Sequence, residues 1–460
     1  MIRKLLRRAI NVLRRSPPAA TTEPALIPLV RHGIHREAIA SGARRTCETL
    51  QKNGFMAFVV GGAVRDLIAG IIPKDYDIAT NATPDQVRGL FRRSRIIGRR
   101  FQIVHVMQGG ETLEVSTFRA AHDADTQKDE HGRVLRDNVW GSLAEDAARR
   151  DFTINALYYD PGNETVLDYH HGVADIRQKT LRIIGDPRAR YREDPVRMLR
   201  AVRLSAKLGL TIDPAARTPI REMASLMENV PAPRAFDEML KLLFSGHSVE
   251  CLRRLRDEGL HHGLLPLLDV ILEQPMGERF VMLALTSTDQ RVLQGKPTSP
   301  GFLFATLLWH EVLSDWEERK RQGQTPIPAL LEAMDAVLDQ QSEKLAITRR
   351  IGGDIKDIWA LQPRFEKRSG KMALRLLEQP RFRAGYDFLL LRAESGEVAM
   401  ELADWWTRFQ EVDMDERMAM LQPDTAKKRG RGGRRRGAKA QADAQDVAKT
   451  GELFGAEPKK

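Results

Sequence analysis

The hydrophobic pattern of the chain changes near residue 185, and this change divides the expected fold into two parts. Between about 50 and 180, short apolar runs such as 55–60 (FMAFVV) end at glycines, whereas Leu, Ala, Arg and Glu recur at helical spacing from there to about 415. Short runs bounded by glycine are typical of strands, and a 3.6-residue period is typical of amphipathic helices. The sequence therefore predicts an α/β head followed by an all-α neck, body and C-terminal region.

Five segments are expected along the chain. We expect a basic N-terminal arm and linker at 1–35, the α/β head at 36–180, a helical neck at 181–245, a helical body at 246–420 and a basic Arg/Gly/Lys-rich tail at 421–460. The tail has too few apolar residues to bury a core, so it is expected to be disordered. The polar stretch 119–138 is expected to form a loop. Within the head, Gly109-Gly110 is expected to join two strands in a hairpin, a helix is expected to start at Thr83-Pro84-Asp85, and 142–159 is expected to be helical.

Most of the excess positive charge lies at the two ends of the chain. Lys and Arg number 73 and Asp and Glu number 62, which gives a net charge of +11. Residues 1–15 and 427–439 contain basic residues and no acidic ones. Such arms suit a polyanion, either nucleic acid or an anionic membrane surface. Residues 1–15 also have the spacing of a basic amphipathic helix, and a plain solvated arm is an equal alternative for them.

The composition also narrows the class of protein and its compartment. No apolar run approaches the roughly 18–20 residues that cross a bilayer, so no integral membrane contact is expected. Two cysteines, Cys47 and Cys251, are too few for a disulfide framework or a multi-cysteine zinc site. A reducing compartment, and hence a cytoplasmic location, is expected.

Two carboxylates are predicted to converge at Asp75-Tyr76-Asp77. The segment 74–80 (KDYDIAT) has the pattern of a strand, in which residues i and i+2 point to the same face. Carboxylates that lie so close repel each other unless a cation lies between them, and oxygen ligands suit Mg²⁺. A pair of this kind alone more often marks the solvated end of a strand.

A glycine pair precedes these carboxylates and strengthens the interpretation. Gly61-Gly62 follows the apolar run and begins a short helical pattern that contains Arg65. Small residues let backbone N–H groups approach a phosphate, and an arginine can donate two hydrogen bonds to a phosphate. A lone glycine pair is usually only a turn, but the combination with two spaced aspartates indicates a phosphate site beside a metal site.

A third group of charged residues recurs at helical spacing. Asp194, Arg197, Arg200 and Arg203 follow one another every three residues, which places them on neighbouring positions of one helix face. Without further context, the simplest interpretation is a solvated ladder of ion pairs. The run 149–151 (RRD) would similarly be an ion cluster at the end of a helix.

Taken together, these motifs resemble those of the class II nucleotidyltransferases of the polymerase-beta superfamily, which are the CCA-adding enzymes and bacterial poly(A) polymerases. The segments that carry the resemblance are GGAVRDLIAGIIPKDYDIATNATP at 61–84, RRDFTINAL at 149–157 and EDPVRMLRAVR at 193–203. The resemblance covers roughly residues 50–240 and implies a mixed-sheet nucleotidyltransferase palm in the head.

The resemblance also implies roles for individual residues. Asp75 and Asp77 would bind two catalytic Mg²⁺ ions, and Asp151 would supply a further active-site carboxylate. Asp194 and Arg197 would read the edge of the incoming base. Phosphate or ribose contacts are implied for Gly62, Arg65, Arg150, Arg200 and Arg203. Glu114 lies on an expected strand that could neighbour the aspartates, which makes it a weaker third metal-site candidate.

The expected reaction is the transfer of a nucleotide to an RNA 3′-hydroxyl with release of pyrophosphate. One metal would lower the pKa of the hydroxyl, and the other would hold the β- and γ-phosphates. The Asp194 carboxylate would accept a hydrogen bond from the amino group of adenine or cytosine, whereas guanine and uracil present a carbonyl there. That mismatch costs about 1–3 kcal/mol. It does not exclude CTP.

Three features favour a poly(A) polymerase within the class. The segment 96–106 resembles one that marks the bacterial poly(A) polymerases, and the loop 119–138 with the helical continuation through 382–394 resembles their layout. The basic tail would hold RNA without reading its sequence. The expected function is therefore template-independent addition of AMP from ATP to RNA 3′ ends of any sequence, in RNA processing and turnover, with the RNA-degradation machinery as a further partner. The alternatives are a CCA-adding enzyme and, more distantly, a non-catalytic RNA-binding protein.

Overall fold

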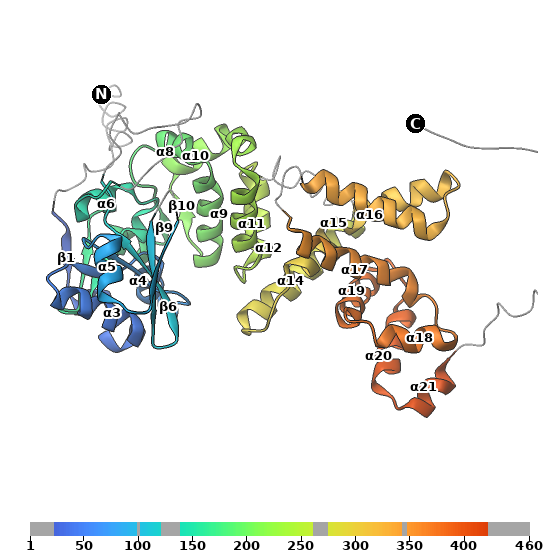
Figure 1. Ribbon diagram of the computed structural model, residues 1–460. Coiled ribbons are helices and arrows are strands. Elements are labelled where there is room, and N and C mark those ends of the chain that lie inside the picture. Colours follow the sequence, from blue (N-terminus) through green and yellow to red (C-terminus); the bar gives the residue numbers. More distant parts are fainter. Residues whose placement is uncertain (1–22, 99–101, 121–138, 261–274, 343–346, 422–460) are drawn as a thin grey trace, which may run out of the picture.

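The computed structural model describes residues 23–98, 102–120, 139–260, 275–342 and 347–421. Figure 1 shows a β-sheet head at one end and a long array of helices that leads away from it. The N-terminal arm 1–22, most of the loop 119–138 and the tail beyond 421 lie outside the described residues. Within the described part of the chain, none of the helices is long and apolar enough to cross a membrane.

The head is built on one mixed eight-stranded sheet in the order β1-β8-β7-β2-β3-β6-β5-β4. Only the central pair β3 and β6 is parallel, and every other neighbouring pair is antiparallel. The strands are β1 Ala25–Ile27, β2 Ala57–Val60, β3 Asp77–Thr80, β4 Ser94–Ile97, β5 Ile103–Gln108, β6 Glu111–Thr117, β7 Leu157–Asp160 and β8 Thr165–Asp168. A separate two-stranded sheet joins β9 Thr180–Leu181 to β10 Thr211–Ile212.

The two faces of the sheet are covered unequally. On one face, apolar side chains of α3 (Ser41–Lys52), α4 (Gly62–Ile68) and α5 (Pro84–Leu90) pack against the alternate strand residues in one core cluster. On the other face, α6 (Leu143–Arg149) covers a smaller cluster around β2 and β7, which includes Phe58 and Tyr158. On this second face, β5 and β6 present His105 and Glu114, which are in contact with solvent. The candidate metal site lies on this second face.

Several expected elements of the head are confirmed. The glycine pair Gly109-Gly110 joins β5 and β6 in an antiparallel hairpin whose register pairs Gln108 with Glu111. Helix α5 begins where the sequence predicts it, because Thr83 caps the helix and forms a reciprocal capping box with Gln86. Strand β3, however, begins at Asp77, so Asp75 lies just before the strand rather than on it.

The expectation that 142–159 returns to helix is confirmed for its first part and wrong for its second. Helix α6 ends at Arg149, a 3₁₀ turn follows at Thr153–Asn155, and 157–160 forms strand β7 between β2 and β8. Tyr158 and Tyr159 are both fully buried because they face the two opposite cores of the sheet. Strand β4, which the sequence pattern did not indicate, lies at the edge of the sheet.

The remaining chain is helical, as predicted. After the short helices α2 Leu29–His32 and α7 Gly172–Arg177 in the head, the helices are α8 Pro187–Glu193, α9 Val196–Leu208, α10 Pro214–Glu222, α11 Ala232–Leu243, α12 Ser248–Asp257, α14 Pro275–Leu293, α15 Pro300–Arg321, α16 Pro326–Ser342, α17 Arg349–Phe365, α18 Gly370–Leu377, α19 Phe382–Ser395, α20 Met400–Glu411 and α21 Met414–Met420. Short 3₁₀ helices span Arg36–Ala38 and Ala224–Asn229.

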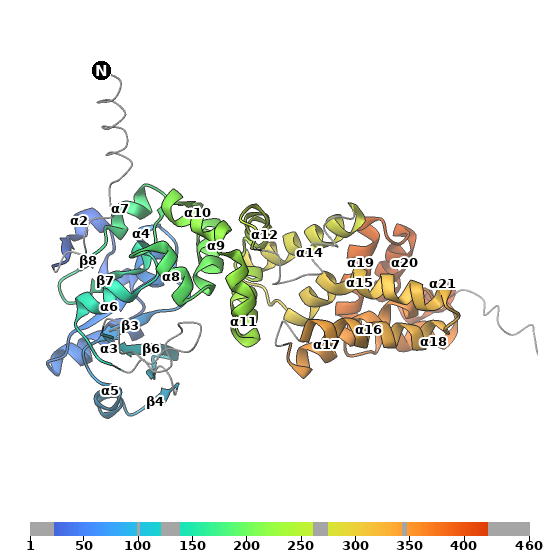
Figure 2. The ribbon, with the colours of Figure 1, turned by 90° about the horizontal axis from the view of Figure 1, so that it is seen from above.

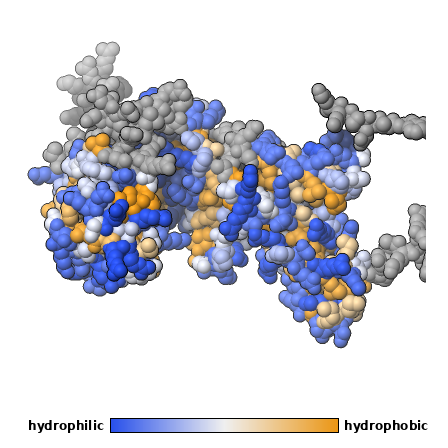
Figure 3. Space-filling view, viewed as in Figure 1, coloured by the Kyte–Doolittle hydropathy of each residue, from blue (hydrophilic) through white to orange (hydrophobic). Residues whose placement is uncertain are grey.

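One apolar core runs from the junction with the head into the helical body. It contains Phe152 and Ile154 of the head, much of α9, and the interior of α14, α15 and α16. A second helical core lies at the C-terminal end, between α17, α18, α19 and α20. Figure 3 shows hydrophilic and apolar residues interspersed over the surface of both the head and the helices.

Candidate metal- and nucleotide-binding site

The glycine pair forms a tight turn between β2 and α4. Gly61 has φ +73° and ψ −124°, a conformation that favours glycine, and its N–H donates to the carbonyl of Leu157 at 3.1 Å. A Cβ atom at Gly61 would lie 3.4 Å from Nη1 of Arg150. The turn therefore lets a guanidinium group approach the end of strand β2 closely.

Asp77, one of the two predicted carboxylates, lies beside this turn. Asp77 pairs with Val60 at the end of β2 and, on its other side, with Glu114 of β6. Glu114 pairs in turn with His105 of β5, and their side chains lie 3.5 Å apart. The register thus aligns Asp77, Glu114 and His105 in one row across three strands. The neighbourhood expected for Glu114 is confirmed, whereas the sequence analysis missed His105.

Asp77 is surrounded by more negative than positive charge. Partial burial and then the Glu114 and Asp75 carboxylates raise the pKa of Asp77 from its ordinary value of 3.8, Arg150 acts in the opposite direction, and the net result is a pKa of about 6. A carboxyl group with a raised pKa beside two other carboxylates is favourable for a cation. The excess of negative charge around Asp77 fits a divalent metal ion held by Asp77 with Glu114 or Asp75.

The protein supplies only part of such a metal site. Among the described residues, no group of three or more His, Cys, Asp or Glu side chains is arranged so that it could hold a metal ion. Asp75 lines a cavity of about 600 Å³, together with Lys74 and Tyr76. The donor set therefore fits Mg²⁺, which is commonly held by one or two carboxylates with phosphates and water as its other ligands.

Replacing Asp77 by asparagine is expected to raise the melting temperature of the metal-free protein. Because the pKa of Asp77 is raised in the folded protein, the folded state is more stable while Asp77 is protonated. This contribution to the free energy of unfolding is lost as the pH rises through about 6. The gain should be absent below about pH 4 and constant above about pH 6. Melting temperatures measured in EDTA across this pH range give the gain in stability of the variant. Added Mg²⁺ should then raise the melting temperature of the wild type more than that of the variant. A gain that is equal at low and high pH would contradict this electrostatic origin.

Arg150 is held beside the glycine turn by two buried side chains. Its Nε donates to the Tyr158 hydroxyl at 2.9 Å, and its Nη2 donates to Oδ2 of Asp146 at 3.1 Å. The Tyr158 hydroxyl donates to the same Asp146 oxygen at 2.7 Å. These contacts leave the guanidinium facing the turn, where the resemblance implies a nucleotide contact. Neither Asp146 nor Tyr158 was predicted from the sequence.

Tyr158→Phe is expected to raise KM for ATP roughly tenfold, because it removes one charge-assisted hydrogen bond worth about 1.5 kcal/mol from Arg150. Tyr159→Phe is the matched control. Tyr159 is the next residue on β7 and equally buried, but its hydroxyl has no hydrogen-bond partner among the described residues. Steady-state kinetics of both variants measure the difference. Equal KM values for the two would mean that Tyr158 does not position Arg150.

Arg65 is more enclosed than the sequence analysis expected. It is 7% exposed, its Nε and Nη2 donate to Asp66, and its Nη1 donates to Oδ1 of Asn155 at 2.6 Å. The other Asp66 oxygen accepts from Lys207 of α9 at 3.2 Å. Each of its three guanidinium nitrogens thus has a protein partner. The predicted phosphate contacts of Arg65 and of Gly62 stay predictions.

Asp151 is the hydrogen-bond partner of the neck helix. Its carboxylate accepts from the Phe152 N–H at 2.8 Å, from Asn155 at 3.1 Å and from Nε of Arg200 at 2.7 Å. Burial alone would raise the pKa of Asp151, but Arg200 and these hydrogen bonds lower it to about 2. The Asp151 carboxylate is therefore ionised and accepts hydrogen bonds from several donors, and it can hold Arg200 of α9 in position. The predicted catalytic role of Asp151 stays a prediction.

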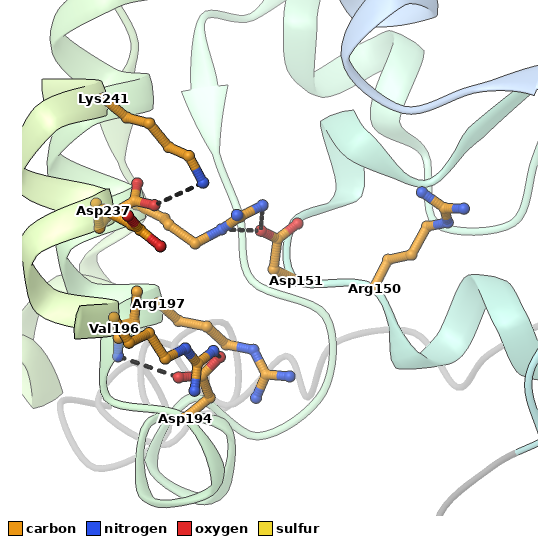
Figure 4. A pocket seen from close by; sticks show the side chains of 10 residues that line it. Arg150, Asp151, Asp194, Val196, Arg197, Asp237 and Lys241 are labelled. Carbon is orange, nitrogen blue, oxygen red and sulfur yellow. Dashed lines mark hydrogen bonds and ion pairs between the residues drawn. The ribbon is translucent and has the colours of Figure 1, made fainter. Parts of the chain in front are cut away.

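A cavity of about 480 Å³ lies between this segment and the neck. Arg150 and Asp151 line one side of it, Asp194 and Arg197 lie at the start of α9, and Asp237 and Lys241 extend from α11 on the opposite side (Figure 4). Five of the predicted site residues therefore meet in one cavity; these are Arg150, Asp151, Asp194, Arg197 and Arg200. Asp75, Asp77, Gly62, Arg65 and Arg203 do not line it.

The two predicted base-reading residues have protein partners. Oδ2 of Asp194 accepts from Arg234 of α11 at 2.5 Å, and Nη1 of Arg197 donates to Glu193 at 2.7 Å. Arg203 does not itself line the cavity, but its Nε donates at 2.7 Å to Glu238, which does. The nucleotide contact expected for Arg203 therefore stays a prediction.

The charged face of α11 is the main feature that the sequence analysis missed. Arg234, Asp237, Glu238 and Lys241 all line the cavity, and they follow the spacing of one helix face. That spacing was visible in the sequence and could have drawn attention to the helix. Nothing in the sequence, however, indicated that this face meets Asp194 across forty residues.

Three protein-family models match parts of the chain. Residues 57–182 match "Poly A polymerase head domain", 209–272 match "Probable RNA and SrmB- binding site of polymerase A" and 322–440 match "Polymerase A arginine-rich C-terminus". Over 408 residues the chain is 43% identical to Poly(A) polymerase I of Salmonella typhimurium, which covers 86% of this chain and 88% of that protein.

This chain belongs to the bacterial poly(A) polymerase family.

Its relation to CCA-adding enzymes is more distant. A CCA-adding enzyme of Levilactobacillus brevis is 37% identical over 219 residues, which cover 47% of this chain and 54% of that enzyme. A solved tRNA nucleotidyltransferase complexed with a primer tRNA and an incoming ATP analog has a TM-score of 0.52 at 20% identity, over 80% of this chain and 98% of that chain. The resemblance that the sequence indicated is thereby confirmed, and the likeness to poly(A) polymerase I extends through much of the helical body.

Proposed function

We propose that this chain is a polynucleotide adenylyltransferase that adds AMP from ATP to RNA 3′-hydroxyl groups without a template and releases pyrophosphate. The observation that carries the proposal is the 43% identity to Poly(A) polymerase I over most of both chains. The row of Asp77 and Glu114 beside the Gly61 turn supports the chemistry. The solved relative that holds a primer tRNA and an ATP analog supports RNA and ATP as substrates.

Asp75 and Asp77 would hold Mg²⁺, and Glu114, which pairs with Asp77, is a weaker third candidate. When bound, the metal lowers the pKa of the RNA 3′-hydroxyl and stabilises the charge of the departing pyrophosphate. Arg150 is positioned by Tyr158 and Asp146 to contact the triphosphate at the glycine turn. The protein thus places one guanidinium beside the carboxylates, where negative charge from the nucleotide accumulates.

Asp194 and Arg197 would select the base in the cavity on the neck. Oδ1 of Asp194 accepts only a long contact from the Val196 N–H at 3.3 Å, so it retains capacity to accept from an amino group of adenine. Guanine or uracil would bring a carbonyl oxygen against it, which costs about 1–3 kcal/mol. Arg200, held by Asp151, would contact phosphate or ribose at the other side of the cavity.

The cellular setting is part of the proposal. A cytoplasmic location agrees with Cys47 and Cys251, which are both free and buried. The substrates would be RNA 3′ ends of any sequence, and the RNA-degradation machinery would act on the tailed products. The basic arms at 1–15 and 427–439, which lie outside the described residues, would hold this RNA through its phosphates.

One primer-extension assay tests the function against CCA addition. Purified protein with Mg²⁺ is given a generic RNA with each NTP singly, and a tRNA that lacks its CCA end with CTP and ATP. Long ladders from ATP alone are expected. Addition that stops after C, C and A on the tRNA would favour the CCA-adding enzymes. No incorporation from any NTP, with RNA binding intact, would favour a non-catalytic RNA-binding protein.

A further inference from the structure

Several cations on the described part of the helical body are paired with a nearby carboxylate. Lys320 pairs with Glu317, Arg321 with Glu318, and Arg383 with Asp387, each within one or two turns of the same helix. Lys356, Arg381 and Arg392 have partners on other turns or helices. Paired surface cations of this kind present little net charge to a ligand.

Other cations of the described body have no such partner, and five of these lie close together within residues 364–375. They are Arg364, Lys367, Arg368, Lys371 and Arg375, which we call the basic patch. None of the five forms an ion pair with any residue that the structure describes, and the only carboxylate within 364–375 is Glu366. Four of the five are exposed. The Nε of the fifth, Arg368, is buried and has no hydrogen-bond partner in the described part of the chain.

The fold gathers these cations on two consecutive helices. Arg364 lies in the last turn of α17, Lys367 and Arg368 lie in the connection, and Lys371 and Arg375 are four residues apart on α18. Residues at this spacing lie on the same face of a helix. Five like charges within two helical turns and a short loop repel one another, and an anion with several negative charges relieves that repulsion.

The helices that carry the basic patch lie on the same side of the molecule as α11, which lines the nucleotide cavity. Figure 2 shows α11, α17 and α18 along one side, whereas α12, α14, α19 and α20 lie along the other. Helix α11 lines the cavity, and α18 lies at the end of the helical body that is farther from the sheet. A strand that enters the cavity with its 3′ end could therefore continue along this side towards the patch.

We propose that the basic patch binds the phosphate backbone of the RNA substrate upstream of its 3′ end. This inference rests on the proposed function, because it assigns a second contact to the same RNA. The contact is independent of sequence, since unpaired cations recognise phosphates and not bases. Because the patch is remote from the cavity, only an RNA long enough to span both can use it. The patch therefore makes affinity depend on the length of the RNA.

The test is a charge-neutralised variant of the full-length chain, Arg364→Gln with Lys371→Gln and Arg375→Gln. All three side chains are exposed and unpaired, so the variant should fold normally. For oligo(A) of about 40 nucleotides at low salt, KM should rise roughly tenfold, and the slope of log KM against log salt should fall by about 2, because single strands lose about 0.7 per phosphate contact. For oligo(A) of about 6 nucleotides, and for ATP, KM should not change.

A matched control removes the same charge elsewhere on the body. Lys320→Gln with Arg321→Gln and Arg383→Gln also lowers the net charge by three, but these cations are paired, so KM for long RNA should stay near that of the wild type. Equal effects of the two triple variants would overturn the proposal, as would an equal rise for short and long RNA. If the patch variant bound long RNA as tightly as the wild type, the proposal would be overturned, and an acidic protein surface would be the favoured ligand of the basic patch. Failure of the proposed function itself would appear differently, as no ATP incorporation on any RNA by the wild type.

Discussion

Asp77→Asn should lower AMP incorporation at least about a thousandfold, because a metal ion held by this carboxylate contributes several kcal/mol to the transition state. Asp77 lies between Val60, which precedes the Gly61 turn, and Glu114, and burial together with the surrounding carboxylates raises its pKa. Asparagine keeps the shape of the side chain and removes the charge. Single-nucleotide addition under saturating RNA, ATP and Mg²⁺ measures the loss, and Asp75→Ala should behave similarly.

The matched control for this prediction is Asp85→Asn. Asp85 is exposed in the first turn of α5, which packs on the face of the sheet opposite to Asp77. The activity of this variant should stay within about twofold of the wild type, because surface substitutions away from a site have small effects. RNA binding by Asp77→Asn should also persist, since the expected RNA contacts lie elsewhere. Activity of Asp77→Asn within tenfold of the wild type would show that this carboxylate does not hold the catalytic metal.

Asp151→Asn should be the second most damaging change. It leaves the Arg200 guanidinium without its carboxylate at 2.6 Å, and breaking a largely buried ion pair costs about 3 kcal/mol of unfolding free energy. The kcat/KM for ATP should fall about a hundredfold if Arg200 loses its position in the cavity. Chemical denaturation and steady-state kinetics give the two values. Arg217→Gln, which breaks an ion pair with the buried Glu258 outside the cavity, should cost stability without this kinetic loss.

A double-mutant cycle then separates two roles for Asp151. If Asp151 acts only by positioning Arg200, Arg200→Gln should cost about as much activity, and the double variant should be no worse than either single one by more than about threefold. If Asp151 binds the metal instead, its losses should add to those of Arg200→Gln. The Mg²⁺ concentration for half-maximal activity would then rise in Asp151→Asn alone. The four donors that already surround Asp151 favour the positioning role.

Strands and turns of the head were predictable where the residues that determine them are close together in the sequence. The capping box at Thr83 and the hairpin at Gly109-Gly110 depend on residues within a few positions of each other, and both are confirmed. The segment 142–159 shows the limit of such reasoning. Tyr158 and Tyr159 fit an amphipathic helix by composition, but the strands β2 and β8, which lie on either side of them, determine their conformation.

The site was predictable where one motif contains its own partners. Asp77 and the glycine turn are sixteen residues apart, and the pairing of β2 with β3 brings them together. The partner of Asp194, in contrast, is Arg234 on another helix, and the partner of Asp66 is Lys207. Ion pairs between distant segments leave no periodic signal, so the face of α11 and the enclosure of Arg65 could be learned only from the structure.

The attachment of α9 to the head has a consequence for the design of hybrid polymerases. Arg200 and Lys207, which lie two turns apart on this helix, bind Asp151 and Asp66 of the head. Met198 and Val202 of α9 share a core with Phe152 and Ile154. A crossover placed before α9 would therefore separate two carboxylates from their cations and expose apolar surface. Chimaeras that exchange heads between relatives should cross over after Lys207, so that each head keeps the helix on which it depends.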